Sequence, residues 1–265
     1  DRSPSRGLGD VYKRQSELLA EELKICPPFI NENLEIAVPN YFLGNWLREQ
    51  ITIKNQISAL YELKTISSYT ESLLANFFPE IDMGLWNFES IKWGIIDSLE
   101  ELNSFKESLP LRNWINKYLD NKKTIDGDIY NLTKKITNNF IDYLIFRPEM
   151  IAQWNRYEIN SSNLFKNLNS DQFWQPILYK LLEEKISEKP SCLYMIEVIK
   201  NLRKIKNVQF QVPNQIYIFS DNNLSKLHIN FYSELSKFTK VNLYLLSAGD
   251  DLWNRINCLE GELEF

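Results

Sequence analysis

Short β-rich runs alternate with helical segments at both ends of this 265-residue chain, and this order restricts the fold more than any other feature. Each run is bounded by turn residues or by an apolar pattern of helical period. A strand, a helix and a second strand in this order require a right-handed crossover between parallel strands. We therefore predict an α/β fold with a parallel sheet. Its strands are expected at residues 34–38, 57–63, 215–219 and 241–246.

The middle of the chain differs from both ends, because residues 85–210 contain no run that resembles a strand. Its apolar residues, Trp93 and Trp114 among them, recur at helical spacing and are interpreted as core, not as surfaces for stacking bases. We predict a helical insertion subdomain at 85–210. It would separate two halves of the α/β domain, residues 16–84 and a truncated 211–265.

The first fifteen residues, DRSPSRGLGDVYKRQ, have no apolar period and contain one proline and two glycines. Apolar periodicity begins only after Ser16, a residue type that often caps helices. We interpret residues 1–15 as a non-native or disordered leader that packs poorly and supplies no strand. The whole chain is interpreted as a fragment of a longer protein.

Composition restricts the function only loosely. The net charge is −5, whereas a free-standing DNA-binding module is usually basic. A subunit whose basic surface lies elsewhere in a longer chain stays possible. The three cysteines, at positions 26, 192 and 258, show no CxxC spacing and are expected to be buried, reduced thiols. No run reaches the roughly 18 apolar residues of a membrane span, so we expect a cytoplasmic protein without membrane contact.

The chain also lacks the usual residues of an active site. It has no GxxxxGK[ST] phosphate loop, and no serine has the spacing of a nucleophile elbow. The single histidine, His228, lies within an apolar-periodic helix and is interpreted as a packed or surface residue. We expect no catalytic residue, no metal site and no cofactor in this chain.

Residues 138–156, NNFIDYLIFRPEMIAQWNR, are the most informative stretch. The pattern predicts a helix that ends near Arg147, because Pro148 disfavours helical backbone in the residue before it. A second helix is expected to follow, with Met150, Ile151 and Trp154 on its apolar face. The residues expected to be buried by the first helix are Phe140, Tyr143, Leu144 and Phe146.

Four segments, in order, resemble blocks of the exodeoxyribonuclease V gamma subunit (RecC) family. They are VPNYFLGNWLREQI at 38–51, a strand, helix and proline over 57–79, residues 138–156 followed by FWQPILYKLL at 173–182, and residues 215–256. The resemblance covers about residues 16–256. It departs in the last block, where Asn222-Asn223 stands in place of a serine-rich turn and Ser247-Ala-Gly replaces Asn-Pro-Cys.

This resemblance implies a fold like an inactivated superfamily 1 helicase domain. It implies a non-catalytic DNA-handling subunit of a RecBCD-type helicase–nuclease in double-strand break repair by homologous recombination. Such a subunit guides and scans the 3′ strand that emerges from a split duplex. Its partners would be RecB-like and RecD-like subunits, which would carry the ATP and Mg²⁺. The alternative function is an α/β scaffold or protein-interaction domain without DNA contact.

The resemblance also names candidate DNA-binding residues. Arg147 stands at the family's Arg-Pro motif, and its structural alternative is a salt bridge that caps the helix end. Asn40 and Asn45 fall in the strand–turn–helix block, and the preceding helix contributes Asn138, Asn139 and Asp142. The family favours an Asp-x-x-Asp-like pattern in that helix, so recognition of the same hotspot sequence is not carried over. Trp46, Trp154 and Trp174 also match and are interpreted as core.

Overall fold

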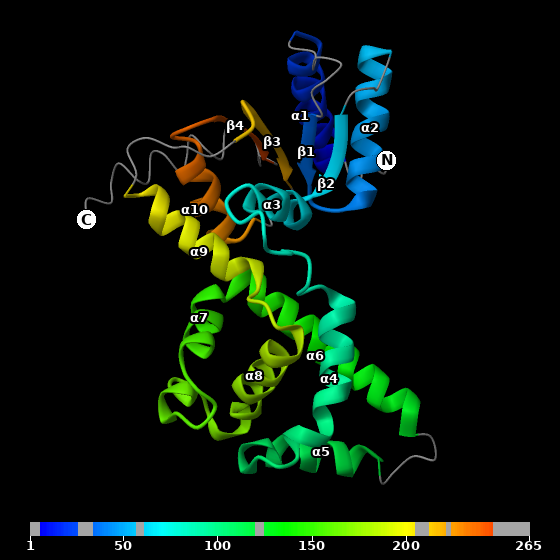
Figure 1. Cartoon of the computed structure of the whole chain (residues 1–265). Coiled ribbons are helices and arrows are strands. Elements are labelled where there is room, and N and C mark those ends of the chain that lie inside the picture. Colours follow the sequence, from blue (N-terminus) through cyan, green and yellow to red (C-terminus); the bar gives the residue numbers. More distant parts are fainter. Residues whose placement is uncertain are drawn as a thin grey trace, which may run out of the picture. The chain divides into compact units, whose positions relative to one another are not determined.

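The computed structural model describes residues 6–25, 34–56, 61–119, 125–204, 212–220 and 224–245. The chain divides into two compact units (Figure 1). The sheet unit comprises Asp1–Thr70, Gln211–Leu224 and Leu235–Phe265, and the helical unit comprises Glu71–Phe210 and Ser225–Glu234. The first division between these units falls between Thr70 and Glu71. The predicted domain bounds, 16–84, 85–210 and 211–265, stay predictions. That the helical region is an insertion stays a prediction.

The sheet unit contains four parallel strands in the order β2-β1-β3-β4, so the predicted α/β class with a parallel sheet is confirmed. Ile36 on the central strand β1 lies beside Leu63 on β2 and Tyr217 on β3. β1 and β3 begin at their predicted residues, β4 begins one residue earlier, and β2 begins four residues later. The strands are β1 Leu34–Val38, β2 Tyr61–Thr65, β3 Gln215–Ser220 and β4 Lys240–Leu245.

The start of β2 differs from the prediction, which placed this strand at 57–63. Residues 57–60 lie outside the described residues, and the paired strand extends to Thr65. Its alternation explains the position: Tyr61 and Leu63 pack against the core, whereas Lys64 points away and pairs with Glu35 of β1. A prediction from apolar residues alone missed this polar end of the strand.

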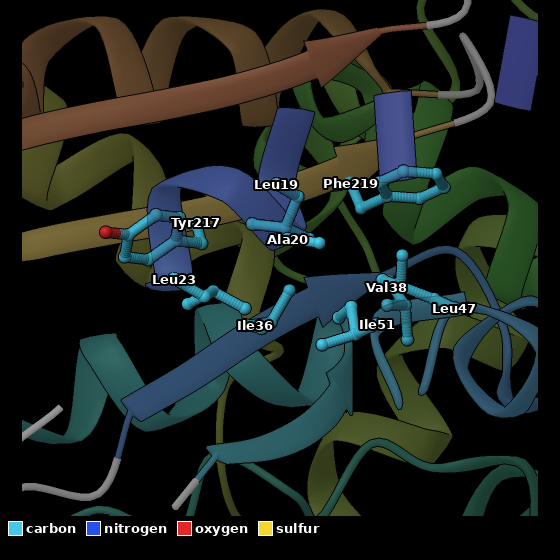
Figure 2. Close-up of a cluster of buried hydrophobic side chains, with 9 residues drawn as sticks. All are labelled: Leu19, Ala20, Leu23, Ile36, Val38, Leu47, Ile51, Tyr217 and Phe219. Atoms are coloured by element: carbon cyan, nitrogen blue, oxygen red, sulfur yellow. The ribbon is translucent and has the colours of Figure 1, made fainter. Parts of the chain in front are cut away.

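Two helices, α1 (Arg6–Ile25) and α2 (Tyr41–Asn55), pack on one face of the sheet and enclose its core. Figure 2 shows this core, in which α1 contributes Leu19 and Leu23 and α2 contributes Leu47 and Ile51. Gly44 permits the close approach of α2, because a Cβ atom there would lie 3.2 Å from the Val38 side chain. The full cluster is Leu19, Ala20, Leu23, Ile36, Val38, Leu47, Ile51, Tyr217 and Phe219.

Helix α1 begins at Arg6, so the prediction that helical structure starts at Ser16 is wrong. The Ser16 hydroxyl donates a hydrogen bond to the Lys13 carbonyl, at 2.7 Å, as a serine inside a helix does. Gln15, expected to pack poorly, is buried. Residues 6–15 supply no strand, as predicted, because they are helical.

The helical unit has no strand among its described residues. Gly94 of α4 lies against Leu182 of α8, so closely that a Cβ atom would be 2.7 Å from the leucine. Tyr179 stacks on Trp86 and contacts Trp154, with ring centroids 5.4 and 5.9 Å away. No described helix is long and apolar enough to cross a membrane. The helices are α3 Ile66–Ala75, α4 Phe88–Leu102, α5 Leu109–Leu119, α6 Ile125–Phe146, α7 Pro148–Arg156, α8 Trp174–Ile186, α9 Ser191–Leu202 and α10 Lys226–Leu235; α3 and α10 each cross a boundary between the units.

Candidate nucleic-acid interface

Arg147 occupies the corner between α6 and α7, as the sequence predicted. Its backbone N–H donates to the Tyr143 carbonyl at 2.9 Å, which closes α6. Its own carbonyl accepts from Met150 and Ile151 at 3.0 and 3.2 Å, which opens α7, with Pro148 as the first helical residue. One residue therefore ends one helix and begins the next, and its side chain is exposed.

The predicted structural alternative for Arg147 was a salt bridge at the helix end. Among the described residues, no carboxylate lies within salt-bridge distance of its guanidinium. The helix dipoles nearly offset each other here, because the cation stands at the C-terminus of α6 and at the N-terminus of α7. The position therefore offers Arg147 little electrostatic stabilisation from the protein and leaves its donors available to a ligand.

Aromatic packing joins the two helices on either side of this corner. Phe140 and Trp154 are each 1% exposed, and their ring centroids are 6.4 Å apart. Tyr143 contacts both rings, meeting Trp154 edge-on at 6.1 Å. The core interpretation of Trp154 is confirmed, while Trp46 and Trp174 are partly buried. Because α6 and α7 share this cluster, the direction of the chain at Arg147 is fixed by packing.

The C-terminal end of α7 is fixed by a polar cluster with α8. Lys180 donates to the Asn155 carbonyl at 3.0 Å and to the Glu183 carboxylate at 2.7 Å. The Asn155 amide also donates to Glu183. A lysine on the last carbonyls of a helix is favourable for both hydrogen bonding and the dipole. The ring of Trp154 and the polar groups of the neighbouring Asn155 therefore both anchor the C-terminal half of α7.

The exposed face of α6 runs up to this corner, and we call it the α6 outer face. All three predicted site residues on this helix, Asn138, Asn139 and Asp142, lie on it and are exposed. Phe146 is 57% exposed, so the prediction that it is buried is wrong. Phe146 follows the buried Phe140 by six residues, which places it about 120° away around the helix. The α6 outer face consists of Lys134, Lys135, Asn138, Asn139, Asp142, Phe146 and Arg147.

The α6 outer face combines groups that suit a single strand of nucleic acid. Three basic side chains stand against one acidic side chain, so its net charge is positive although the chain is acidic. Basic groups contact phosphates, amides contact base edges, and an exposed ring such as Phe146 offers a stacking surface. Sequence reasoning missed Lys134 and Lys135, although their i, i+4 spacing to Asn138 and Asn139 was visible.

The two other predicted site residues lie in the sheet unit, at the start of α2. The Asn40 side-chain oxygen accepts from the Leu43 backbone N–H at 2.9 Å and so caps the helix. Asn45 is exposed one turn later. Tyr41 and Phe42 beside them are 69% and 90% exposed. These four residues form an exposed aromatic and amide surface that follows the carboxyl end of β1.

The remaining chemically reactive groups are accounted for by packing. His228 is buried, with Nδ1 2.7 Å from the Ser225 hydroxyl, and its backbone N–H also donates to that oxygen at 3.3 Å. Burial lowers the pKa of His228 to about 4. Cys192 is a buried free thiol whose pKa burial raises to about 12. Cys26 and Cys258 lie outside the described residues. Among those described, no three His, Cys, Asp or Glu side chains cluster to hold a metal.

Comparison with known proteins identifies relatives over nearly the whole chain. The family model described as RecC, N-terminal domain, matches residues 11–261. The RecBCD enzyme subunit RecC of Escherichia coli is 23% identical over 254 residues, which cover 93% of this chain and 22% of that protein. The subunit of the same name from Haemophilus influenzae is 21% identical over 268 residues, covering 93% and 24%. This chain therefore spans less than a quarter of the curated relatives it matches.

Proposed function

Because this chain belongs to the RecC N-terminal domain family, we propose that it is a non-catalytic DNA-handling part of a RecBCD-type helicase–nuclease. In this role it would contribute to double-strand break repair by homologous recombination. It would guide the single 3′ strand that leaves the split duplex. We expect it to work in the cytoplasm with RecB-like and RecD-like subunits, since its relatives are named as RecC subunits of RecBCD enzymes.

The observation that carries the proposal is Arg147, an exposed cation without an ion-pair partner among the described residues, at the corner where α6 ends and α7 begins. A guanidinium without an ion pair can meet a phosphate without first breaking a salt bridge in the protein. Lys134 and Lys135 extend the positive charge along α6, so that neighbouring phosphates can follow the helix.

Base contacts would come from the amides and rings between these cations. Asn138 and Asn139 can hydrogen-bond base edges, and Phe146 can stack on a base. In the sheet unit, Tyr41 and Phe42 provide a second stacking surface, with Asn45 beside them. Asn40 is already used as a cap through its oxygen, so we assign it the weaker role.

The fold in the proposal is that of an inactivated superfamily 1 helicase domain with a helical insertion. The four-stranded parallel sheet with helices after β1 and β3 supports it. We propose that ATP and Mg²⁺ act in the partner subunits. The purified chain should therefore neither hydrolyse ATP nor cut DNA. ATP turnover that disappears on mutation of one residue of this chain would contradict that assignment.

The test is single-strand binding by the Arg147→Ala variant. Fluorescence anisotropy with a labelled oligonucleotide should show weaker binding and a salt dependence reduced by about 0.7 in logarithmic slope, the value for one lost phosphate contact on a single strand. Arg156→Ala is the matched control, since Arg156 is also exposed and lies at the other end of α7. Equal losses in both variants would contradict the assignment of Arg147. Undetectable binding by the unmodified chain and by its assembled complex would favour the scaffold alternative.

A further inference from the structure

The exposed side of α4 carries a different chemistry from that of α6. Trp93, expected in the core, is 54% exposed. Four acidic residues surround it at helical spacing along the same side and are also exposed. We call this surface the α4 outer face; it consists of Glu89, Trp93, Asp97, Glu100 and Glu101.

The indole of Trp93 is held in place by its own helix. Its Nε1 donates to the Glu89 carboxylate at 3.2 Å. The same carboxylate accepts from the buried Lys92 ammonium at 2.6 Å, and that ammonium lies 5.0 Å from the Trp93 ring centroid. Lys92 also lies 5.3 Å from the centroid of Tyr130 on α6, itself 43% exposed. An exposed tryptophan fixed in this way binds a partner with little loss of side-chain entropy.

The charges on this face are only partly neutralised. Glu89 is paired with Lys92, and Glu101 lies 3.6 Å from Lys185. Asp97 and Glu100 have no ion pair with any described residue. Asp97 lies one turn beyond Trp93, where helix geometry places two side chains next to each other. The face therefore offers an aromatic ring beside an uncompensated carboxylate.

We propose that the α4 outer face docks an arginine-bearing basic segment of another protein, with a guanidinium stacked on Trp93 and bound to Asp97. A planar guanidinium can stack on the indole and donate two parallel hydrogen bonds to a carboxylate, which an ammonium cannot do. Nucleic acid is the wrong ligand for this face, because its phosphates would meet four carboxylates. The inference goes beyond the proposed DNA-handling function and does not depend on it.

The probe is a fluorescein-labelled octapeptide of alternating arginine and serine, with a lysine–serine peptide of equal charge as its control. Anisotropy titrations of the full 265-residue chain should give tighter binding of the arginine peptide. Trp93→Ala should weaken that binding roughly two- to fivefold and remove the preference for arginine over lysine. Asp97→Lys should weaken it by about tenfold, since it replaces an attraction with a repulsion.

Two variants on the α6 outer face serve as matched controls, Phe146→Ala for the exposed ring and Asp142→Lys for the exposed carboxylate. Both should leave peptide binding unchanged. Thermal melting verifies that each variant is folded, and Asp97→Lys tests the proposal even if Trp93→Ala unfolds. Equal affinity of the two peptides, or equal losses from Asp97→Lys and Asp142→Lys, would overturn it. The proposal would also be overturned if single-stranded DNA competed with the arginine peptide for the unmodified chain and this competition disappeared in Asp97→Lys.

Discussion

The outer faces of α4 and α6 belong to the same helical unit and differ mainly in the sign of their charge. The α6 outer face has three basic side chains and one acidic side chain, whereas the α4 outer face has four acidic ones. Each carries one large exposed ring, Phe146 on α6 and Trp93 on α4. Exposed rings therefore do not by themselves select a ligand. The surrounding charges decide between phosphates and a basic protein segment.

The largest expected effect distinguishes the buried residues that support the α6 outer face from the exposed residues of that face. Phe140→Ala should lower the free energy of unfolding by about 3–5 kcal/mol, because it leaves a cavity in the aromatic cluster of Phe140, Tyr143 and Trp154 that joins α6 to α7. Phe146→Ala on the same helix should change it by less than about 0.5 kcal/mol, because that ring is exposed. Urea unfolding followed by circular dichroism measures both. Similar losses of stability in the two variants would mean that Phe146 is packed and does not belong to the α6 outer face.

Protonation of His228 should lower the stability of the helical unit in acid, an effect that does not distinguish the two outer faces. The pKa of His228 is about 4 in the folded chain, because the ring is buried, against about 6.5 when unfolded. The unfolded chain binds the extra proton between these values, so the contribution of His228 to stability should fall by roughly 3 kcal/mol as the pH drops from about 6.5 to 4. His228→Gln should flatten this dependence in urea titrations at several pH values.

Glu71 is the matched control for that pH experiment, because its effect has the opposite sign. Burial, assisted by Asp82, raises its pKa to about 7. The folded chain then binds more protons than the unfolded chain between about 4.5 and 7, and this contribution to stability is lost as the pH rises through 7. Glu71→Gln should therefore enlarge the net loss of stability in acid, because it removes a gain that opposes the His228 loss. An acid loss that disappears in this variant would contradict the assignment to His228.

Charge reversal tests the comparison of the two faces directly. Lys134→Glu combined with Lys135→Glu should weaken single-strand binding by about 10- to 100-fold at low salt, because two phosphate contacts become repulsions. Asp97→Lys combined with Glu100→Lys on α4 should not weaken it. Anisotropy with one oligonucleotide measures both double variants. If the α4 variant lost affinity instead, the assignment of ligands to the two faces would be reversed.

The smallest effect concerns Asn40, the predicted site residue that the structure uses as a cap. Asn40→Ala should lower stability by about 1 kcal/mol through loss of the bond to the Leu43 N–H. Asn40→Ser keeps a capping oxygen and should restore most of it. Thermal melting and oligonucleotide binding of both variants distinguish a capping role of Asn40 from a DNA-contacting role. A loss of binding in the serine variant with normal stability would show that the Asn40 amide contacts DNA.

Sequence reasoning succeeded where the signal is local. The residue before a proline cannot continue a helix, so Arg147 was placed at a helix end that the structure confirms. The β-rich runs around Ile36 and Tyr217 predicted two strands of one parallel sheet, and the structure pairs these two residues. The helices between the strands imply parallel pairing, and these helices are themselves predicted from their apolar period. Family membership over residues 11–261 was likewise visible as four ordered segments.

The exposed rings are where sequence reasoning failed. Trp93 and Phe146 were each assigned to an apolar face, and both are more than half exposed. Helical period places both rings away from the buried residues: Trp93 is two residues from Ile91 and Ile95, about 160° around the helix, and Phe146 is about 120° from Phe140. The side of a helix that is covered also depends on neighbours distant in sequence, as with Gly94 of α4 against Leu182 of α8. The lysines of the α6 outer face were missed although their i, i+4 spacing to Asn138 and Asn139 was visible in the sequence.

Turn residues, alternation and helical period act over a few residues, so the chain alone predicts the parallel α/β class, the break at Pro148 and the family. Tertiary packing sets which side of each helix is covered, leaves the Arg147 guanidinium without an ion pair to a described carboxylate, and exposes acidic side chains on α4 and basic ones on α6. These properties depend on packing between segments that lie far apart in the chain, and the free energy of burial is set there and not by local pattern.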